Sequence, residues 1–389
     1  MTRQPIIGVV GLGTMGLGIA QVFAAAGFEV IATDTFAPAR TLARSRMAEA
    51  LAGRVEAGKM SPEARDKTLS HLSVGAELAD LAPCGLVIEA IVEKVAAKQG
   101  LFQALEAVVA RDAVLGTNTS SIPVHAIATG LKYPDRCLAL HFFNPPAAMK
   151  LVELARHSGT SAAAATLART LAEAAGKTVV SCPDRPGFIV NRCARPYYGE
   201  ALALKAEGHA APEIDAALQA AGYRLGPFAL IDLIGADVHL AATEGLYAAM
   251  GQHPRYLPFP ALRAQVASGH LGRKTGQGFV FPGAQGATPQ GAAAIVLRIE
   301  ATLINEAHWL LSEGGTTATG IDTAMRLGLN FPRGPFEALD NHGRAAILTE
   351  LSRLRRGAPE ALKSRYDPAP GLENPQDVGT PIRSAKKDE

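Results

Sequence analysis

Short apolar runs rich in Val, Ile and Leu alternate with helical patterns through about the first 180 residues of the chain. This alternation is typical of a parallel sheet wrapped by helices. From residue 186 onward, Ala- and Leu-rich helical segments take over and strand-like runs largely disappear. The strands expected in the first part are Ile6–Val10, Glu29–Thr33, Gly85–Ile88, Ala113–Leu115, Cys137–Phe142, Leu151–Leu154 and Thr178–Ser181.

A helical hairpin interrupts this alternation at residues 37–69, between the second and third expected strands. A long helix is followed by a turn at Gly58 and Lys59, and Ser61 then caps a second helix that has Pro62 at its first position. A βαβ unit does not require such a hairpin. We therefore expect it to be an insertion that faces the substrate.

The helical part repeats itself with a period of about 107 residues. Residues 200–232 and 306–340 share a Glu, an Ile-Asp pair, Gly-Pro-Phe and a final apolar-Asp pair in the same order. Two such copies would pack on each other and bury a shared apolar face. We predict an α/β fold, a doubly wound sheet with the hairpin insertion over 1–184, followed by two all-α repeats over 185–283 and 291–370 and a flexible tail over 371–389.

Composition and charge narrow the class of protein. Of the 389 residues, 48% are hydrophobic and 19% charged, as in an ordinary soluble, helix-rich protein. The 38 Lys and Arg against 36 Asp and Glu leave a net charge of +2, which disfavours nucleic acid as a partner. Apolar stretches are shorter than the ~18 residues that span a bilayer, and the early glycines argue against a signal peptide. We expect a cytoplasmic protein with no membrane partner.

The four cysteines, Cys84, Cys137, Cys182 and Cys193, are irregularly spaced and form no Cys-x-x-Cys pair. This spacing fits neither a zinc site nor a disulfide framework, and isolated thiols suit a reducing compartment. We expect no metal site.

A glycine-rich loop follows the first expected strand. Gly11, Gly13 and Gly16 form a Gly-x-Gly-x-x-Gly pattern that opens an apolar helix. The glycines allow a tight turn, and the helix start attracts a pyrophosphate. Asp34 ends the second strand, where a carboxylate accepts hydrogen bonds from the adenosine ribose and repels a 2′-phosphate. The pattern predicts a Rossmann-type site for NAD rather than NADP; a solvent-facing strand end is the alternative for Asp34.

Polar residues 117–121, Thr-Asn-Thr-Ser-Ser, follow the fourth expected strand. Ligands of an open parallel sheet collect at the carboxyl ends of its strands, so these side chains could bind a cofactor or a substrate oxygen. Capping of the next helix is the alternative role.

His141 ends one expected strand and Glu153 lies in the next. Both are equidistant from Ala147 in the Pro-containing turn, so an antiparallel hairpin would place them opposite each other. A carboxylate beside an imidazole fixes its tautomer, and oxidation of an alcohol needs a base to take the hydroxyl proton. A cross-strand surface pair is the alternative. The location at the cofactor edge of the sheet favours a catalytic pair.

Asn191 lies in an apolar helical stretch, where an amide is costly unless it has a partner. In the second copy Arg298 corresponds to Arg192, whereas Leu297 corresponds to Asn191. The difference predicts that the first copy contributes to a site and that the second is scaffold.

Several motifs in register resemble the 3-hydroxyacyl-CoA dehydrogenase family. They are GLGTMGLGIAQ, EAIVEK, TNTSSI, LHFFNPPAAMKLVEL, PGFIVNR and GRKTGQGF, in order over residues 1–281. The duplicated helical part resembles most the longer phenylacetate-pathway type, which acts on 3-hydroxyadipyl-CoA or 3-hydroxybutyryl-CoA. The resemblance implies an NAD-dependent oxidation of an L-3-hydroxyacyl-CoA to the 3-ketoacyl-CoA.

The resemblance also implies roles for individual residues. His141 would be the general base with Glu153 as its partner, and Ser120 and Asn191 would hydrogen-bond the substrate oxygen. The cofactor contacts carried over from the family are Gly11, Leu12, Gly13, Thr14, Met15, Gly16, Asp34, Glu93, Lys98, Ser120, Asn144 and Lys274. The hairpin insertion would meet coenzyme A, but Ala50 and Ala57 stand where relatives often have Ser and Lys. Lys59 or a nearby Arg could substitute for them.

Three alternatives have different sequence signatures. An NAD-dependent dehydrogenase of a free hydroxy acid, such as a sugar acid, would not need the hairpin insertion. A non-catalytic NAD-binding scaffold would not need the set Ser120, His141, Glu153 and Asn191. A zinc alcohol dehydrogenase lacks its Cys and His ligand spacing here. The second helical copy could cover the surface by which shorter relatives dimerise, so we expect either a monomeric pseudo-dimer or a homodimer.

Overall fold

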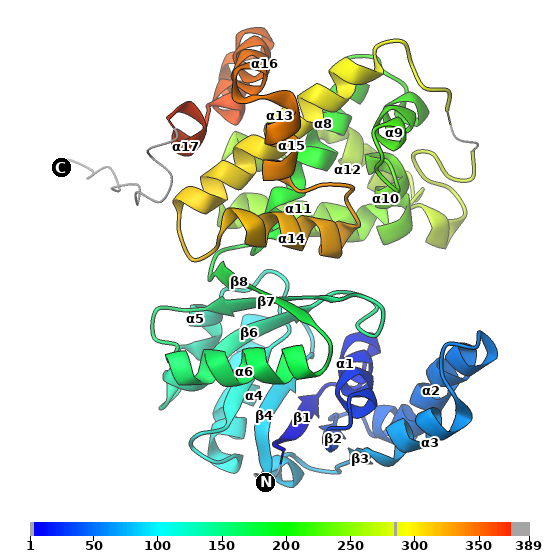
Figure 1. Ribbon diagram of the computed structural model, residues 1–389, viewed down its shortest axis with the longest axis vertical. Coiled ribbons are helices and arrows are strands. Elements are labelled where there is room, and N and C mark those ends of the chain that lie inside the picture. The colour runs from blue at the N-terminus through cyan, green and yellow to red at the C-terminus, as the bar shows by residue number, and fades with distance from the viewer. Residues whose placement is uncertain (1–3, 284–285, 375–389) are drawn as a thin grey trace, which may run out of the picture. The chain divides into compact units, whose positions relative to one another are not determined.

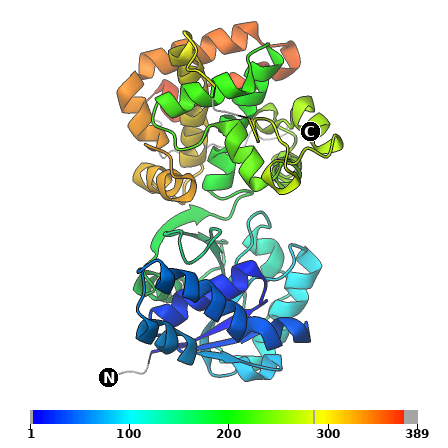
Figure 2. The same ribbon diagram turned by 90° about the vertical axis from the view of Figure 1, so that its right-hand side faces the viewer.

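A computed structural model describes residues 4–283 and 286–374. Residues 1–3, residues 284–285 between the two predicted helical repeats, and most of the expected tail, 375–389, lie outside the described residues. The chain divides into two compact units, Met1–Arg185 and Pro186–Glu389 (Figures 1 and 2). The first unit contains the sheet and the second is helical, which confirms the predicted fold class.

The first unit is built on an eight-stranded sheet with the strand order β3-β2-β1-β4-β5-β6-β7-β8. The strands β1 to β6 pair in parallel, whereas β7 runs antiparallel to β6 and β8 runs parallel to β7. Their bounds are β1 Ile6–Val10, β2 Val30–Thr33, β3 Leu72–Val74, β4 Cys84–Glu89, β5 Val114–Thr117, β6 Cys137–Phe142, β7 Leu151–Arg156 and β8 Thr178–Pro183. All seven expected strands are present. The sequence analysis missed β3 because three residues with a central Ser carry no readable alternation.

Helices cover the sheet and bury its apolar faces, as parallel strands require. They are α1 Thr14–Ala25, α2 Ala37–Glu56, α3 Pro62–Ser70, α4 Val95–Val108, α5 Val124–Ala128 and α6 Ala162–Ala174, with 3-10 turns η1 Leu78–Leu81 and η2 Pro134–Arg136. Residues of α1, α2 and α6 join those of the strands in one buried cluster. The predicted hairpin is α2 and α3, and the Ser61 hydroxyl accepts a hydrogen bond from the Ala64 N–H as predicted. It connects β2 to the missed strand β3.

The second unit consists of two sets of equivalent helices. The first set comprises α7 Val190–Cys193, α8 Arg195–Ala206, α9 Ala211–Ala220, α10 Pro227–Ile234, α11 Ala236–Ala249, η3 Pro254–Tyr256, α12 Pro260–Ala267 and η4 Arg273–Thr275. The second comprises α13 Ala292–Ser312, α14 Ala318–Leu329, α15 Pro335–His342, α16 Arg344–Gly357, η5 Glu360–Tyr366 and α17 Pro370–Glu373. The long helix α13 occupies the place of α7 and α8 together.

The two sets exchange buried ion pairs in a reciprocal manner. Arg192 donates from Nε to Glu306 at 2.7 Å and from its two Nη atoms to Glu313. Arg298 donates from Nε to Glu200 at 2.9 Å and from its Nη atoms to Glu207. Arg298, Glu306 and Glu313 each lie 106 positions after Arg192, Glu200 and Glu207. Each copy therefore contacts the other through the same residues, as the two sides of a two-fold interface do.

The second copy continues beyond the end that the sequence analysis assigned to it. The tail was expected to begin at residue 371, but α17 runs over Pro370–Glu373 and Leu372 is fully buried. A repeat explains the difference, since residues 366–372 read Tyr-x-Pro-x-Pro-x-Leu and residues 256–262 read the same. Leu262 and Leu372 thus fill equivalent core positions. The sequence after Leu372 is polar, and for this reason the tail was predicted to begin one residue before it.

Candidate functional site

The glycine loop connects β1 to α1 and matches the cradle of a pyrophosphate. Gly11 has φ +99°, and a Cβ there would lie 2.6 Å from the Ala90 carbonyl oxygen. A Cβ on Gly16 would lie 1.7 Å from the Gly11 carbonyl oxygen, so the turn closes only with glycine at both positions. Helix α1 starts at Thr14 with no side-chain cap and no acidic residue in its first turn. Its N-terminal N–H groups therefore favour an anion.

Asp34 lies directly after β2 and contacts this loop. Its Oδ2 accepts a hydrogen bond from the Leu12 N–H at 2.7 Å, and its Oδ1 accepts one from the Phe36 N–H at 2.8 Å. A carboxylate offers about four lone-pair positions, so two of them remain for ribose hydroxyls. The alternative of a strand end that only faces solvent is therefore not what the structure shows, because Asp34 fixes the loop.

A buried charge cluster lies beside the polar segment 117–121. Lys98 Nζ lies 2.5 Å from Glu89 Oε1 and 3.2 Å from Glu93 Oε2, and both Lys98 and Glu89 are buried. Glu93 accepts hydrogen bonds from the Thr119 hydroxyl and the Ser120 N–H. The positive charge of Lys98 and these hydrogen bonds outweigh burial and lower the pKa of Glu93. Glu93 therefore stays ionised and fixes the segment that carries Ser120.

Segment 117–121 shows the capping role considered for it, and it also links two strands. The Asn118 side chain accepts a hydrogen bond from the Phe142 N–H at 2.8 Å and so joins the end of β5 to the end of β6. The Thr119 hydroxyl accepts one from the Ile122 N–H before α5, which is the capping role. Ser120 follows them in the segment between β5 and α5, beyond the carboxyl end of β5. Asn144 is exposed and precedes a cis peptide bond to Pro145.

His141 and Glu153 form a buried imidazole–carboxylate pair on neighbouring strands. They are direct partners in the antiparallel register of β6 and β7, which confirms the predicted hairpin. The Nδ1 of His141 and Oε2 of Glu153 are 2.7 Å apart. Glu153 is fully buried and His141 is 7% exposed, so the pair is not a surface pair. A carboxylate accepts at this distance, hence His141 carries its proton on Nδ1 and Nε2 is the atom able to accept another.

A basic cavity of ≈ 410 Å³ lies between α1, α2 and the turn that joins β6 to β7. Arg54, Lys150 and Lys177 line it, and none of the lining residues is acidic. Lys177 donates from Nζ to the carbonyl oxygens of Pro146 and Met149, at 2.6 and 2.8 Å. Burial lowers the pKa of Lys177 to about 8. The cavity is therefore suited to an anionic group, whose charge would stabilise the ammonium form.

One sequence-predicted residue, Lys59, lies outside this cavity, and two others belong to the second unit. Lys59 is exposed in the turn after α2 and does not line this cavity. Asn191 and Lys274 belong to the second unit, where Asn191 is part of α7 and its carbonyl oxygen accepts a hydrogen bond from Arg195 Nε. Lys274 forms an ion pair with Asp237 at 2.5 Å and lowers its pKa by hydrogen bonding.

Glu89 escaped the sequence analysis, and Arg54 was covered there only as an unnamed Arg near Lys59. Glu89 is the buried partner of Lys98, and its signal is a carboxylate at the end of an otherwise apolar strand. Arg54 lines the basic cavity, and its signal is its position four residues after Ala50 and three before Ala57 on one face of α2. Among the described residues, no cluster of three or more His, Cys, Asp or Glu could hold a metal ion. No described helix is long and apolar enough to cross a membrane.

Matches to protein-family models divide the chain near residue 186, where the two compact units of the structure also meet in the sequence. Residues 6–185 match the model described as 3-hydroxyacyl-CoA dehydrogenase, NAD binding domain. The model of the corresponding C-terminal domain matches twice, at residues 187–281 and 295–385. The NAD cofactor inferred from the glycine loop and Asp34 is thereby confirmed, and so is the duplication of the helical part.

Individual relatives agree with these matches. The chain is 44% identical over 280 residues to the 3-hydroxyadipyl-CoA dehydrogenase of Escherichia coli, covering 72% of this chain but only 59% of that protein. It is 42% identical over 277 residues to a 3-hydroxybutyryl-CoA dehydrogenase of Mycobacterium tuberculosis, covering 70% of this chain and 96% of that protein. A crystal structure of 3-hydroxybutyryl-CoA dehydrogenase from Escherichia coli superimposes with TM-score 0.89 at 32% identity, over 95% of this chain and 98% of the other.

Proposed function

Because the chain belongs to the 3-hydroxyacyl-CoA dehydrogenase family, we propose that it oxidises an L-3-hydroxyacyl-CoA reversibly to the 3-ketoacyl-CoA with NAD. The observation that carries this proposal is the buried pair His141 and Glu153 at the strand edge that also holds the glycine loop. Relatives named for 3-hydroxybutyryl-CoA and 3-hydroxyadipyl-CoA support a CoA thioester as the substrate.

In the proposed reaction His141 acts as general base. Its Nε2 takes the proton of the 3-hydroxyl group. NAD held at the glycine loop would supply the acceptor for the hydride that leaves C3. Glu153 holds Nδ1–H and stabilises the imidazolium that forms, which needs no reorganisation because the contact of 2.7 Å already exists. Ser120 and Asn191 are proposed to hydrogen-bond the substrate oxygen and so aim the hydroxyl group at His141.

The residues proposed to hold NAD fit that cofactor on two counts. The uncapped start of α1 suits the pyrophosphate, and Asp34 retains acceptor positions for the ribose. Glu93 and Lys98 support the edge next to Ser120 through their ion pair. The remaining contacts proposed from the family are Leu12, Gly13, Thr14, Met15, Asn144 and Lys274.

We further propose that Arg54, rather than Lys59, serves the phosphates of coenzyme A. Arg54 lines the basic cavity together with Lys150, whereas Lys59 lies outside it. Arg54 also lies between Ala50 and Ala57 on the helix face where relatives often carry their Ser and Lys. A guanidinium binds phosphate in a bidentate manner, so one Arg can replace two weaker contacts.

The reciprocal ion pairs of the second unit support a pseudo-dimeric subunit. Arg192 and Arg298 each bind carboxylates of the opposite copy, so the interface that an isolated copy would need for a partner chain is occupied within this chain. We propose that the protein folds without a partner subunit. Light scattering that finds an obligate dimer built through the second copy would contradict this.

Initial rates of NADH formation test the proposed activity. The wild-type protein is expected to turn over hydroxyacyl-CoA thioesters and not a free sugar acid, which separates the leading proposal from the sugar-acid alternative. His141→Ala is expected to lower kcat by roughly 10²- to 10⁴-fold because proton abstraction is lost, with NAD binding retained by fluorescence titration. His71→Ala, which removes a pairing with Glu29 far from this edge, is the matched control. An unimpaired His141→Ala enzyme would exclude the mechanism.

A further inference from the structure

The helix that carries Asn191 is broken in the first copy and continuous in the second. Asn191 lies in α7, a single turn of four residues, and α8 begins two residues after α7 ends, at Arg195. Pro196 has no N–H to donate to the carbonyl oxygen of Arg192, so one bond of a continuous helix is missing here. In the second copy, α13 covers the corresponding residues as one helix of 21 residues. A single helical turn is not stable by itself, so α7 depends on contacts from outside it.

The backbone directly before α7 is strained. Gly187 has φ +77° and Phe188 has φ +46°, so two successive residues lie in the region that favours glycine. For an aromatic residue this conformation is unfavourable, and it persists only where the surroundings enforce it. The corresponding residues of the second copy, 293 and 294, are helical. The first copy therefore keeps a costly local conformation just before Asn191, and other contacts have to hold it.

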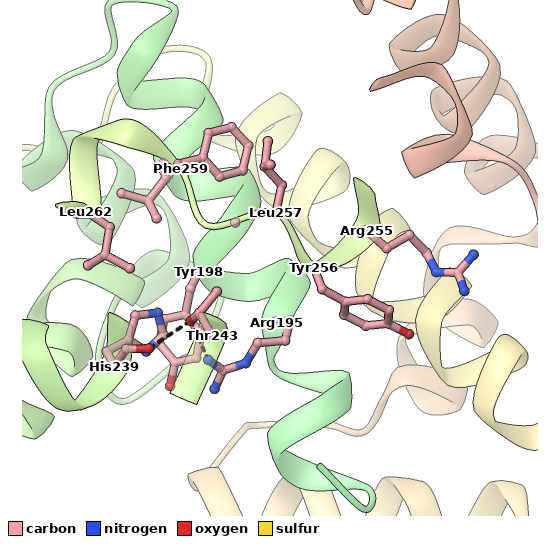
Figure 3. A pocket seen from close by; sticks show the side chains of 11 residues that line it. Arg195, Tyr198, His239, Thr243, Arg255, Tyr256, Leu257, Phe259 and Leu262 are labelled. Carbon is pink, nitrogen blue, oxygen red and sulfur yellow. Dashed lines mark hydrogen bonds between the residues drawn. The ribbon is translucent and has the colours of Figure 1, made fainter. Parts of the chain in front are cut away.

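The guanidinium of Arg195 spans the break between α7 and α8. Its Nε donates to the main-chain carbonyl oxygen of Asn191 at 2.9 Å, and its Nη1 donates to the Thr243 hydroxyl at 2.8 Å. That hydroxyl donates to the carbonyl oxygen of His239, so this chain of hydrogen bonds ends on α11. Figure 3 shows the Arg195 side chain pointing toward Thr243 and His239, and its guanidinium carbon lies 5.3 Å from the centre of the Tyr198 ring. The main chain of Asn191 is thereby tied to α11.

Arg195 is a buried arginine whose contacts are neutral. It is 8% exposed, and no described carboxylate forms an ion pair with it. The other buried arginines of the described residues are Arg136, Arg192, Arg298 and Arg365. Each of those four has a glutamate oxygen within 3.9 Å. A buried guanidinium without a carboxylate is costly, and burial lowers the pKa of Arg195 accordingly. Stabilisation of the unit by an ion pair therefore does not account for Arg195.

The second copy shows that packing does not require this arrangement either. Arg195 and Thr243 have the apolar counterparts Ala301 and Leu351, which are fully buried. Asn191 likewise has an apolar counterpart in that copy. The arginine, its threonine acceptor and the broken helix thus occur together with Asn191, and all of them are absent from the copy that lacks the amide.

We propose that Arg195 is a positioning residue that holds the main chain of Asn191, so that the Asn191 amide meets the substrate oxygen. This inference rests on the proposed function, in which that amide hydrogen-bonds the oxygen of the reacting carbon. The Nε of Arg195 replaces a bond that a continuous helix would supply from its own backbone. Without it, α7 is free to relax the strain at Phe188, and Asn191 shifts. A catalytic hydrogen bond has to be held to within about 0.5 Å, so a small shift lowers the rate.

Three variants of the full-length protein separate the Nε bond from the charge of the side chain. In Arg195→Gln the amide nitrogen takes the place of Nε and keeps an N–H donor, whereas Arg195→Met has no donor there. Arg195→Met is expected to lower kcat about 10-fold with KM for NAD unchanged, and Arg195→Gln to retain most of kcat. Arg195→Lys keeps the charge but has a methylene group in place of Nε, so it is expected to behave as Arg195→Met. A loss in Arg195→Gln as large as that in Arg195→Met, or full activity in Arg195→Lys, would overturn the proposal.

A double-mutant cycle with Asn191 separates positioning from a general structural role. In Asn191→Leu there is no amide to aim, so adding Arg195→Met is expected to leave kcat/KM unchanged. A structural defect would lower kcat/KM by the same factor in both backgrounds, and that result would overturn the proposal. Thr243→Val removes only the acceptor of Nη1 and keeps the side-chain shape. It is expected to lower kcat about 3-fold, and again only where Asn191 is present.

Controls keep this inference distinct from the proposed function. Arg263→Ala removes an exposed arginine of the same unit, paired with Glu244, and is expected to leave kcat and KM unchanged. An active wild type with kcat unchanged in Arg195→Met would overturn this inference alone. A wild type that oxidises no hydroxyacyl-CoA would overturn the proposed function, and this inference with it.

Discussion

The two helical copies of the second unit share the ion pairs that join them, here called the framework, and they differ at the position proposed to contact the substrate. Arg192 and Arg298, with their glutamates, are retained in both and cross from one copy to the other. Asn191 and Arg195 of the first copy correspond to Leu297 and Ala301 of the second. Residues that hold the copies together are thus separable from a residue such as Asn191, which is proposed to contact the substrate. A sequence repeat can therefore point to candidate site residues without any homologue.

A second difference lies in the loop that carries Lys274. Asp232 is buried and accepts hydrogen bonds from three successive N–H groups, those of Phe279, Val280 and Phe281. A Cβ on Gly278 would lie 2.1 Å from the Asp232 carboxylate, so only glycine fits there. The corresponding residue of the second copy, Asp340, is exposed. The first copy uses its aspartate to fix a loop, and this is the loop proposed to reach the cofactor.

The largest expected effect comes from breaking the shared framework. Arg192→Leu and Arg298→Leu are each expected to lower the free energy of unfolding by about 3 kcal/mol, because a fully buried glutamate loses a partner. Urea unfolding of the full chain, followed by circular dichroism, measures this. Arg326→Ala, which removes an exposed pair with Glu337, is expected to change it by less than about 0.5 kcal/mol. If only one of the two variants lowered the free energy of unfolding, the two ion pairs would not contribute equally and the prediction would be wrong.

Substitutions at the position that differs between the copies, Asn191 and Leu297, are expected to separate effects on kcat/KM from effects on the free energy of unfolding. Asn191→Leu writes the second copy's residue into the first and is expected to lower kcat/KM about 100-fold, because one hydrogen bond to the substrate oxygen is lost. Leu297→Asn is the mirror substitution, expected to leave kcat/KM unchanged and to lower the free energy of unfolding by about 1 kcal/mol through a half-buried amide. Similar rate losses in both variants would mean that neither copy is specialised.

The smallest expected effect concerns how the free energy of unfolding falls at acidic pH, and it depends on His239. The pKa of His239 in the folded protein lies well below 6.5. As the pH falls below 6.5, the unfolded chain therefore binds a proton at this residue that the folded protein does not, and the free energy of unfolding decreases. The second copy has the fully buried Ile347 at the equivalent position. His239→Ile is therefore expected to remove about 1 kcal/mol of destabilisation between pH 7.5 and 5.5.

The pH test compares variant and wild type, because other groups titrate in the same window. Burial raises the pKa of Asp215 to about 7 and that of Asp322 to about 6, so protonation of these groups stabilises the folded state as the pH falls, opposite in sign to His239. Thermal unfolding at several pH values measures the difference. Parallel curves for wild type and His239→Ile would rule out a titrating role for this histidine.

Sequence patterns predicted those parts of the molecule that depend on local chemistry. The symmetric placement of His141 and Glu153 about Ala147 was enough to predict their pairing, because a hairpin fixes its register through the turn. Glu89 was not found, and Arg54 was not singled out among the arginines near Lys59, since their partners are distant in the sequence. Glu89 accepts a hydrogen bond from Thr117, and Arg54 faces Lys177 only across a cavity. Packing of separate elements created both arrangements, and no pattern within one segment encodes that.

Because the two copies are parts of one polypeptide, the residues on each side of their interface are encoded separately and can change independently. In an assembly of identical chains, any change at an arginine of the interface appears twice, once on each side. Here Arg192 and Arg298 are altered independently, so the polarity of one crossing can be inverted by exchanging an arginine with its glutamate while the other crossing stays as it is. Such a covalent pair is free to become asymmetric one residue at a time, in a way that a symmetric dimer is not.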